Sequence, residues 1–300
     1  MDIQLLFMLF LIFLMILMMF LLFLLTYSRR NIGDYTILEL IKKGRISAVF
    51  RSKNRKLNCI AAVKVIDPKR AKDKGIVRQF LGEGEALALI NNEFPDSPVV
   101  KVLEYGYNQS NRLYFISMDY LEGSTLLELM KSSKKLDLQE KLYIIREVAR
   151  ALHYSHTLKI YHRDIAPENI LVNGKSVTLI DFGIASHNLS GYNTIFNTIV
   201  GRPYYMSPEQ CSGMPINGKS DIYSLGAVLF YLLEGKPLYK SRNVAEIIKM
   251  HTKKPIPNIK RPITSELAQF VYKMLSKNPE IRPDALEVIN KMEFFMTKES

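Results

Sequence analysis

Near the middle of the chain, acidic and amide side chains follow one another at short spacings. Residues 162–169 have the form H-R-D-x-x-x-x-N, and residues 181–183 read D-F-G. Carboxylate and amide oxygens are the ligands that a hard cation such as Mg²⁺ takes in proteins. Each of these residues alone is more often a turn or capping residue than a catalytic one, so the residues around them decide their meaning.

Three further groups stand in a fixed order around this run. Residues 62–64 (A-V-K) end an apolar stretch upstream, while residues 207–209 (S-P-E) and 221–226 (D-I-Y-S-L-G) lie downstream. Any one of these groups is a weak signal. All of them in this order, with these gaps, form a specific pattern.

With these motifs the chain resembles the eukaryotic-type protein kinase superfamily. Its strings Y-M-S-P-E-Q and H-R-D-I-A-P-E-N are most similar to those of bacterial membrane-anchored Ser/Thr protein kinases. The resemblance covers residues 34–295 and implies an α+β fold of two lobes, a small β-rich N-lobe (about 34–121) and a larger helical C-lobe (about 122–295). It also implies ATP, with Mg²⁺ or alternatively Mn²⁺, as cofactors.

The resemblance assigns roles in phosphoryl transfer, which requires positioning, neutralisation of the triphosphate and an aligned nucleophile. Asp164 would accept or orient the hydroxyl proton of the substrate, while Asn169 and Asp181 would hold Mg²⁺. Glu209 and Arg282 resemble the family's buried ion pair.

Lys64 would neutralise the α- and β-phosphates of the nucleotide. Glu83, in the first helix, would hold Lys64, and Glu85 is the competing assignment; the phasing of residues 80–83 favours Glu83. Asp221 resembles the residue that anchors the catalytic loop in this family.

The loop that covers the nucleotide in this family is irregular here. When Val49 is aligned with the valine of G-x-G-x-x-G-x-V, only Gly44 falls on a glycine position. The backbone approaches phosphate most easily without a Cβ, so this loop is expected to grip less closely. The resemblance implies these nucleotide-binding residues: Lys42, Gly44, Ser47, Val49, Lys64 and the backbones of Asp119 and Leu121.

Two positions depart from the pattern of Ser/Thr kinases. Ala166 stands where most have lysine, and Arg202 stands where they have threonine. In the family that lysine and that threonine meet beside the catalytic aspartate. We hypothesise that Arg202 supplies the missing cation in the space that Ala166 leaves, as an arginine finger does. The alternative is a damaged site.

Regulation by phosphorylation is a further expectation. Arg163 precedes the catalytic aspartate, where it could clamp a phosphate on the activation segment. Thr194 and Thr198 are the best-placed acceptors, with Ser190 and Tyr192 behind them. A solvated polar loop is the equal alternative.

The N-terminal part is a separate apolar segment. As a helix, residues 3–25 would be about 34 Å long, enough to cross a hydrocarbon core of about 30 Å. A cleaved signal peptide is the alternative, but Asp2 precedes the run and no small-residue cleavage site follows it. Arg29 and Arg30, in the basic linker 26–33, favour a cytoplasmic position for everything that follows. We expect a single-pass anchor in the cell membrane with the N-terminus outside.

Hydrophobic periodicity predicts strands first and helices later. Alternating or β-branched runs predict strands over residues 35–40, 47–51, 59–66 and 113–120. Helical spacing predicts helices over residues 76–90, 139–157 and 219–234.

We expect the net charge of +12 to reflect a domain beside an anionic membrane leaflet, where each Lys or Arg gains about 1 kcal/mol; for the basic run 69–74 a solvated face is the more common alternative. No aromatic-interleaved basic module indicates nucleic-acid binding. The two cysteines form no disulfide framework, which is typical of a reducing compartment.

The chain is therefore expected to phosphorylate Ser/Thr hydroxyls of proteins with ATP at the cytoplasmic membrane face. Its implied partners are ATP, protein substrates, the lipid bilayer and a second copy for autophosphorylation, with no nucleic acid. The alternative is a membrane-tethered pseudokinase acting as a scaffold or nucleotide-sensing switch. A small-molecule kinase of related fold ranks last.

Overall fold

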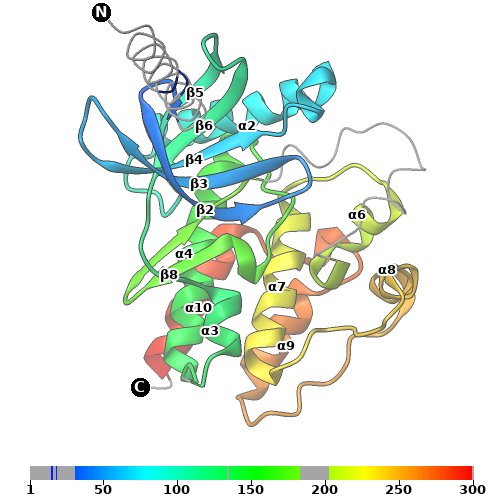
Figure 1. Ribbon diagram of the computed structural model, residues 1–300. Coiled ribbons are helices and arrows are strands. Elements are labelled where there is room, and N and C mark those ends of the chain that lie inside the picture. Colours follow the sequence, from blue (N-terminus) through cyan, green and yellow to red (C-terminus); the bar gives the residue numbers. More distant parts are fainter. Residues whose placement is uncertain (1–14, 16–17, 19–30, 134, 183–202, 299–300) are drawn as a thin grey trace, which may run out of the picture. The chain divides into compact units, whose positions relative to one another are not determined.

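The computed structural model describes residues 31–133, 135–182 and 203–298, together with Met15 and Met18 (Figure 1). Outside these residues lie most of the predicted span 3–25 and linker 26–33, Arg202, and the candidate phosphorylation sites Ser190, Tyr192, Thr194 and Thr198. None of the described helices combines the length and the apolar character that crossing a bilayer requires.

The chain divides into two units. One contains the residues up to 77 together with 103–120, and the other contains residues 78–102 and everything from 121 onward. The first is strand-rich and the second is mainly helical. This division confirms the predicted α+β class.

The first unit is built around a six-stranded sheet in the order β1-β2-β3-β4-β6-β5. Its strands are β1 (Asn31–Ile32), β2 (Tyr35–Lys43), β3 (Ser47–Asn54), β4 (Ile60–Ile66), β5 (Val102–Asn108) and β6 (Leu113–Asp119), and β4 is followed by η1 (Arg70–Lys72) and α2 (Lys74–Glu93). Neighbours from β1 through β4 to β6 pair antiparallel. The four predicted strands are confirmed, and β1 and β5 are additional.

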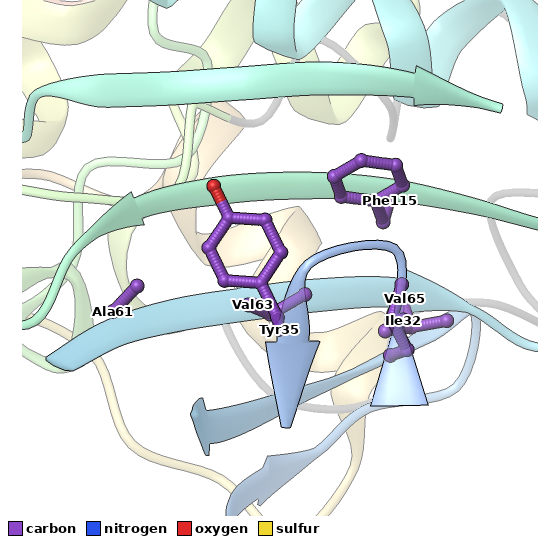
Figure 2. Close-up of a cluster of buried hydrophobic side chains, with 6 residues drawn as sticks. All are labelled: Ile32, Tyr35, Ala61, Val63, Val65 and Phe115. Atoms are coloured by element: carbon purple, nitrogen blue, oxygen red, sulfur yellow. The ribbon is translucent and has the colours of Figure 1, made fainter. Parts of the chain in front are cut away.

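One face of this sheet carries a cluster of buried side chains. Figure 2 shows its members: Ile32, Tyr35, Ala61, Val63, Val65 and Phe115. The rings of Tyr35 and Phe115 lie 6.1 Å apart, and the Tyr35 hydroxyl lies 2.8 Å from Ser117 Oγ. The hydroxyl therefore keeps a hydrogen bond inside the core. A buried side chain as large as Val63 contributes about 1.5–3 kcal/mol to folding.

The alternation of β4 determines where its lysine points. Successive side chains of a strand face opposite sides of the sheet. Because Val63 and Val65 belong to the cluster, Lys64 between them lies on the other face.

The long helix α2 is tied at its end to a later part of the chain. Asn91 accepts a hydrogen bond from Val102 N (2.8 Å) and donates one to Val100 O (3.3 Å). Val100 N donates in turn to Leu179 O (3.1 Å). This end of α2 is therefore linked, within the second unit, to the strand that leads into the D-F-G motif.

The second unit consists of helices and one small sheet. Its elements are β7 (Ser124–Thr125), α3 (Leu126–Lys131), α4 (Leu138–Thr157), η2 (Pro167–Asn169), β8 (Ile170–Asn173), β9 (Ser176–Leu179), η4 (Pro203–Tyr205), α6 (Pro208–Ser212), α7 (Gly218–Glu234), α8 (Val244–Lys253), α9 (Ser265–Met274), η5 (Pro279–Ile281) and α10 (Ala285–Lys298). Helix α4 packs against α7 and α10, and α7 also packs against α9 (Figure 1).

The two central helices form where helical spacing predicts them, and capping residues set their ends. Asp137 and Glu140 make a capping box that begins α4, with Glu140 N donating to Asp137 Oδ1 (2.7 Å). Helix α7 begins after the cap Asn217 and ends at Gly235, whose φ of 71° is left-handed. Because α7 is apolar on all sides, it is buried along nearly its whole length.

Candidate active site

A buried carboxylate holds the backbone of the H-R-D run in place. Asp221, in the first turn of α7, accepts hydrogen bonds from His162 N (2.9 Å) and Arg163 N (2.7 Å). His156 Nε2 lies 2.9 Å from the same carboxylate. Burial alone would raise the pKa of Asp221, but the hydrogen bonds from the His156 ring and from the Arg163 backbone outweigh burial and hold the pKa below its usual value. The anchor is thus ionised at neutral pH, as its assigned role requires.

Two residues of this region have a left-handed backbone. Arg163 has a φ of 66° and Asp181 a φ of 65°. For residues with a Cβ, such a conformation costs roughly 1–3 kcal/mol. At Arg163 the surroundings compensate, because Asp221 accepts from its amide and Gln210 Nε2 donates to its carbonyl (2.7 Å).

Asp164 and Asn169 lie side by side. Asn169 Nδ2 donates to Asp164 O (2.9 Å) and to Asp164 Oδ2 (3.2 Å). Ile180 N donates to Asn169 O (2.9 Å), so the chain reaches Asp181 directly after contacting Asn169. Asp164 and Asn169 are thus in direct contact, and Asp181 is the next residue after the backbone contact between Ile180 and Asn169.

The amide of Asn169 has the character of a cation ligand. Its Nδ2 is engaged by Asp164, whereas its Oδ1 is buried and has no hydrogen-bond partner among the described residues. A buried acceptor without a donor is costly unless a cation or water satisfies it. Asp181 directly follows Ile180, whose N bonds to Asn169 O, so this oxygen and the Asp181 carboxylate fit a hard divalent cation such as Mg²⁺.

The described residues contain no group of three or more His, Cys, Asp or Glu arranged to hold a metal. Mg²⁺ does not need such a group, because it usually binds one or two protein oxygens and completes its shell with water and substrate phosphates.

His162 connects the two halves of the site. Asp164 N donates to its Nδ1 (3.3 Å), and its Nε2 lies 3.2 Å from Ile180 O. Because Nδ1 accepts, the proton must sit on Nε2, which defines a neutral tautomer. The ring also lies 4.6 Å from that of the fully buried Phe182. Phe182 is thus a packing residue.

The buried ion pair has the predicted partners. Arg282 Nη1 and Nη2 donate to Glu209 Oε1 (2.6 Å) and Oε2 (2.9 Å). Ser220 Oγ donates to the same carboxylate. Burial would raise the pKa of Glu209, but these donors hold it below the usual value. The pair ties α6 to the segment before α10.

The candidate nucleotide-binding side chains of the first unit form a row across the sheet. Lys42 pairs with Val49, and Val49 pairs with Lys64, so the three lie side by side on β2, β3 and β4. Gly44 N donates to Ser47 O (2.8 Å) in the turn between β2 and β3, and a Cβ on Gly44 would approach that oxygen to 3.1 Å. Gly44 thus suits this tight turn.

The remaining candidates are distributed over both units. Glu83 is buried on α2 with 1% of its surface exposed, whereas Glu85 is exposed. Asp119 ends β6 and Leu121 begins the next part of the second unit. Ala166 is fully buried directly before η2. The pairing of Lys64 with Glu83 stays a prediction, because the two residues belong to different units.

Sequence reasoning missed two residues that hold the site. His156 reaches Asp221 over Gly218, where a Cβ would come within 2.6 Å of the His156 ring. A glycine at the start of a helix was the available signal. Gln210 forms a capping box with Ser207, and the S-x-x-Q pattern of that box can be recognised in the sequence. Its hydrogen bond to the Arg163 carbonyl cannot, because that contact depends on tertiary packing.

Comparison with known proteins identifies the family of this chain. The family model "Protein kinase domain" matches residues 35–295. The chain belongs to the protein kinase domain family. The match covers both units, and it confirms the resemblance to eukaryotic-type protein kinases.

Relatives of this kinase domain occur in several bacteria. It is 34% identical over 264 residues to a probable serine/threonine-protein kinase of Clostridium perfringens, covering 86% of this chain and 38% of the relative. It is 31% identical over 263 residues to the serine/threonine-protein kinase PrkC of Bacillus subtilis, covering 86% and 40%. The chain thus spans about two fifths of the length of the curated relatives it matches.

A solved structure agrees on the fold. The kinase domain of PknI from Mycobacterium tuberculosis, in a variant with one cysteine replaced by alanine, superposes with a TM-score of 0.67 at 24% sequence identity, covering 88% of this chain and 96% of that one. The chain therefore has the two-lobed kinase fold, with a β-rich N-lobe and a helical C-lobe.

Proposed function

We propose that this protein is a serine/threonine kinase that transfers the γ-phosphate of ATP to hydroxyl groups of protein substrates. The observation that carries the proposal is the paired arrangement of Asp164 and Asn169 on a loop anchored by Asp221. This loop presents a carboxylate beside an amide whose buried oxygen has no donor in the described part of the chain. The relatives' printed descriptions as serine/threonine-protein kinases support the same activity.

In this proposal Asp164 orients the substrate hydroxyl and accepts its proton as the oxygen attacks phosphorus. Its carboxylate accepts a hydrogen bond from the Asn169 amide, and its backbone amide donates one to the His162 ring. Asn169 Oδ1 and Asp181 would hold Mg²⁺, which would supply charge neutralisation for the transferring phosphate. The loop itself aligns the substrate hydroxyl with that phosphate.

In this proposal most residues that bind the nucleotide belong to the first unit, while Glu83 and Leu121 belong to the second. Lys64 neutralises the α- and β-phosphates from the sheet face opposite the core, with Glu83 as its partner. Val49, beside Lys64 in the sheet, covers the nucleotide, with Lys42, Gly44 and Ser47 at the loop. The backbones of Asp119 and Leu121 pair with the adenine edge.

Activity despite the missing loop lysine is proposed to depend on Arg202. Ala166 ends at a methyl group and carries no charge to the site. Replacing Arg202 with threonine should lower turnover strongly in the natural chain but only weakly after Ala166→Lys, because the new lysine would supply the cation. Equal losses in both backgrounds would show that the two positions are uncoupled.

The chain is further proposed to sit in the cell membrane with its kinase domain in the cytoplasm. The apolar run 3–25 followed by Arg29 and Arg30 supports this placement. In bacterial cells expressing the chain, protease added outside should leave the kinase domain intact, and protease added to inverted vesicles should degrade it. Degradation in intact cells would overturn the orientation.

The decisive experiment is phosphate transfer by the full chain in non-ionic detergent, with labelled ATP, Mg²⁺ and a general acceptor protein. Asp164→Asn is the matched control, since it keeps the shape and removes the carboxylate. Label on serine or threonine that disappears in the control supports the proposal. Intact nucleotide binding without transfer would instead support the pseudokinase alternative. Mass mapping of the product also tests autophosphorylation at Thr194 and Thr198.

A further inference from the structure

The positive charge of the second unit is concentrated in one short stretch. Residues 235–262 contain eight Lys or Arg against one Glu, whereas the rest of residues 78–102 and 121–300 contains 18 Lys or Arg against 21 Asp or Glu. We call the eight side chains the basic surface: Lys236, Lys240, Arg242, Lys249, Lys253, Lys254, Lys260 and Arg261. All eight are exposed.

These charges are largely uncompensated. Of the eight, Lys236 alone has a carboxylate within ion-pair distance in the described part of the chain, at 4.0 Å from Glu234. The one acid inside the stretch, Glu246, accepts a hydrogen bond from Ser241. The rest of the basic surface is therefore available to an anionic partner.

Specific hydrogen bonds hold the stretch together as one surface. Glu234 Oε1 accepts from Lys260 N (2.7 Å) and Arg261 N (2.9 Å), next to Lys236. Tyr239 Oη donates to Lys254 O (2.8 Å), which joins the loop before α8 to the loop after it. Both flanks of α8 are thus fixed to the body of the second unit.

The orientation of α8 sends its lysines outward. Ile247 and His251, one turn apart, are buried, and α8 packs with this face on α6 and η4. Lys249 and Lys253, also one turn apart, lie exposed, and Lys254 follows them. In Figure 1 α8 lies beside α6 at the edge of the helical unit.

This position adjoins the elements that support the candidate active site. Helix α6 carries Gln210, which donates to the carbonyl of Arg163 in the catalytic loop (2.7 Å). A protein held on α8 would therefore be tethered close to Asp164, at a raised effective concentration.

We infer that the basic surface is a docking site for an acidic segment of protein substrates, a conclusion that rests on the proposed kinase function. Ten-residue α8 is about 15 Å long, which an extended acidic run of about five residues would cover at roughly 3.3 Å per residue. Complementary charge accelerates such encounters and suppresses wrong partners.

A membrane surface fits this region less well. Helices that lie in a bilayer interface insert exposed Leu, Phe or Trp side chains beside their lysines. Residues 235–262 are all described, and none of their large apolar side chains is fully exposed: Leu238, Tyr239 and Ile247 are buried, and Ile248 and Met250 on α8 are half-buried. The charge is present, but no fully exposed apolar side chain accompanies it.

The test measures binding without catalysis. The full chain in non-ionic detergent is titrated into a fluorescein-labelled peptide of alternating Glu and Ser, without ATP, and anisotropy is followed at low and high salt. The variant Lys249→Glu, Lys253→Glu, Lys254→Glu is compared with Lys131→Glu, Lys135→Glu, Lys175→Glu, which changes three exposed lysines elsewhere in the same unit. The two variants have the same net charge.

We expect the natural chain to bind the peptide in a salt-sensitive manner. The Kd should rise about tenfold or more in the first variant and change less than about twofold in the second. Each exposed ion pair contributes a factor of roughly 1.4 to 5 to the affinity, and the first variant removes three lysines of the basic surface. Equal losses in both variants, or none in the first, would overturn the docking site. Unlabelled peptide should displace the probe, whereas dioctanoyl phosphatidylserine at equal negative charge should not; displacement by the lipid would point to a membrane surface instead.

A kinetic measurement then separates docking from catalysis. For an acceptor protein with an acidic tail, the first variant should raise KM about tenfold and leave kcat unchanged. A short acceptor peptide without the tail should be phosphorylated equally by both variants. Because peptide binding needs no phosphate transfer, failure of the proposed kinase activity would leave the anisotropy result intact.

Discussion

Removal of Arg282 should destabilise the helical unit more than most single substitutions. Its guanidinium makes two hydrogen bonds to Glu209, at 2.6 and 2.9 Å. The same group also donates to the carbonyls of Ser276 (2.7 Å) and Lys219 (2.9 Å). The Arg282 side chain is 0% exposed and that of Glu209 9% exposed, so water does not replace these contacts.

Arg282→Met retains most of the volume but leaves the carboxylate of Glu209 buried without its cation. Breaking a buried pair by removing one partner costs about 3–5 kcal/mol. A domain is stable by only about 5–15 kcal/mol, so this loss is a large share of the total. In Arg282→Met combined with Glu209→Met no charge is left unpaired. The free energy of unfolding of that double variant should fall by at least about 1 kcal/mol less than that of Arg282→Met alone, although the carbonyls of Ser276 and Lys219 remain unpaired.

The measurement is urea unfolding of the full chain in non-ionic detergent, followed by far-UV circular dichroism because the sequence has no tryptophan. The single variants and the double variant form a thermodynamic cycle. Arg282→Lys is a further control, since an ammonium cannot make the paired contact. A loss below about 1 kcal/mol for Arg282→Met, or additive losses in the cycle, would refute the reasoning.

The same pair predicts a pH dependence. The pKa of Glu209 in the folded protein lies below its ordinary value of 4.5. Its stabilising contribution is therefore fully present above about pH 4.5 and is lost as the pH falls through the lower, folded pKa. The difference in unfolding free energy between the natural chain and the double variant should shrink on acidification below that point. A difference independent of pH would contradict the assignment.

Three further predictions concern the site and the thiols. Asn169→Ala should keep the helical content seen by circular dichroism but raise the Mg²⁺ concentration needed for half-maximal transfer, because the buried Oδ1 is removed. Gly218→Ala places a Cβ 2.6 Å from the His156 ring, so it should lower both thermal stability and kcat. Lys219→Ala is a neighbouring control for kcat. If kcat is unchanged in Gly218→Ala, His156 does not help to position the catalytic loop. Burial raises the pKa of Cys211 to about 12 while Cys59 is exposed, so maleimide at neutral pH should label one thiol in the folded chain and two in denaturant, counted by mass; two labels under native conditions would contradict the burial of Cys211.

Local features of this protein could be predicted from the sequence because they depend on spacing along the chain. The inward face of α4, the opposite orientations of Lys64 and Val63 on β4, and the cap at Gly235 all follow from helix and strand periods and from backbone sterics. The candidate catalytic residues also belong here, because motif order along the chain identifies them.

Contacts between residues that are distant in sequence could be known only from the folded structure. His156 and Asp221 are 65 positions apart, and Gln210 and Arg163 are 47 apart. The unsatisfied oxygen of Asn169 likewise depends on which donors the folded chain leaves near it. Such partners are selected by helix packing and by the cost of burying an unpaired polar group, and neither can be read from the spacing of a single segment.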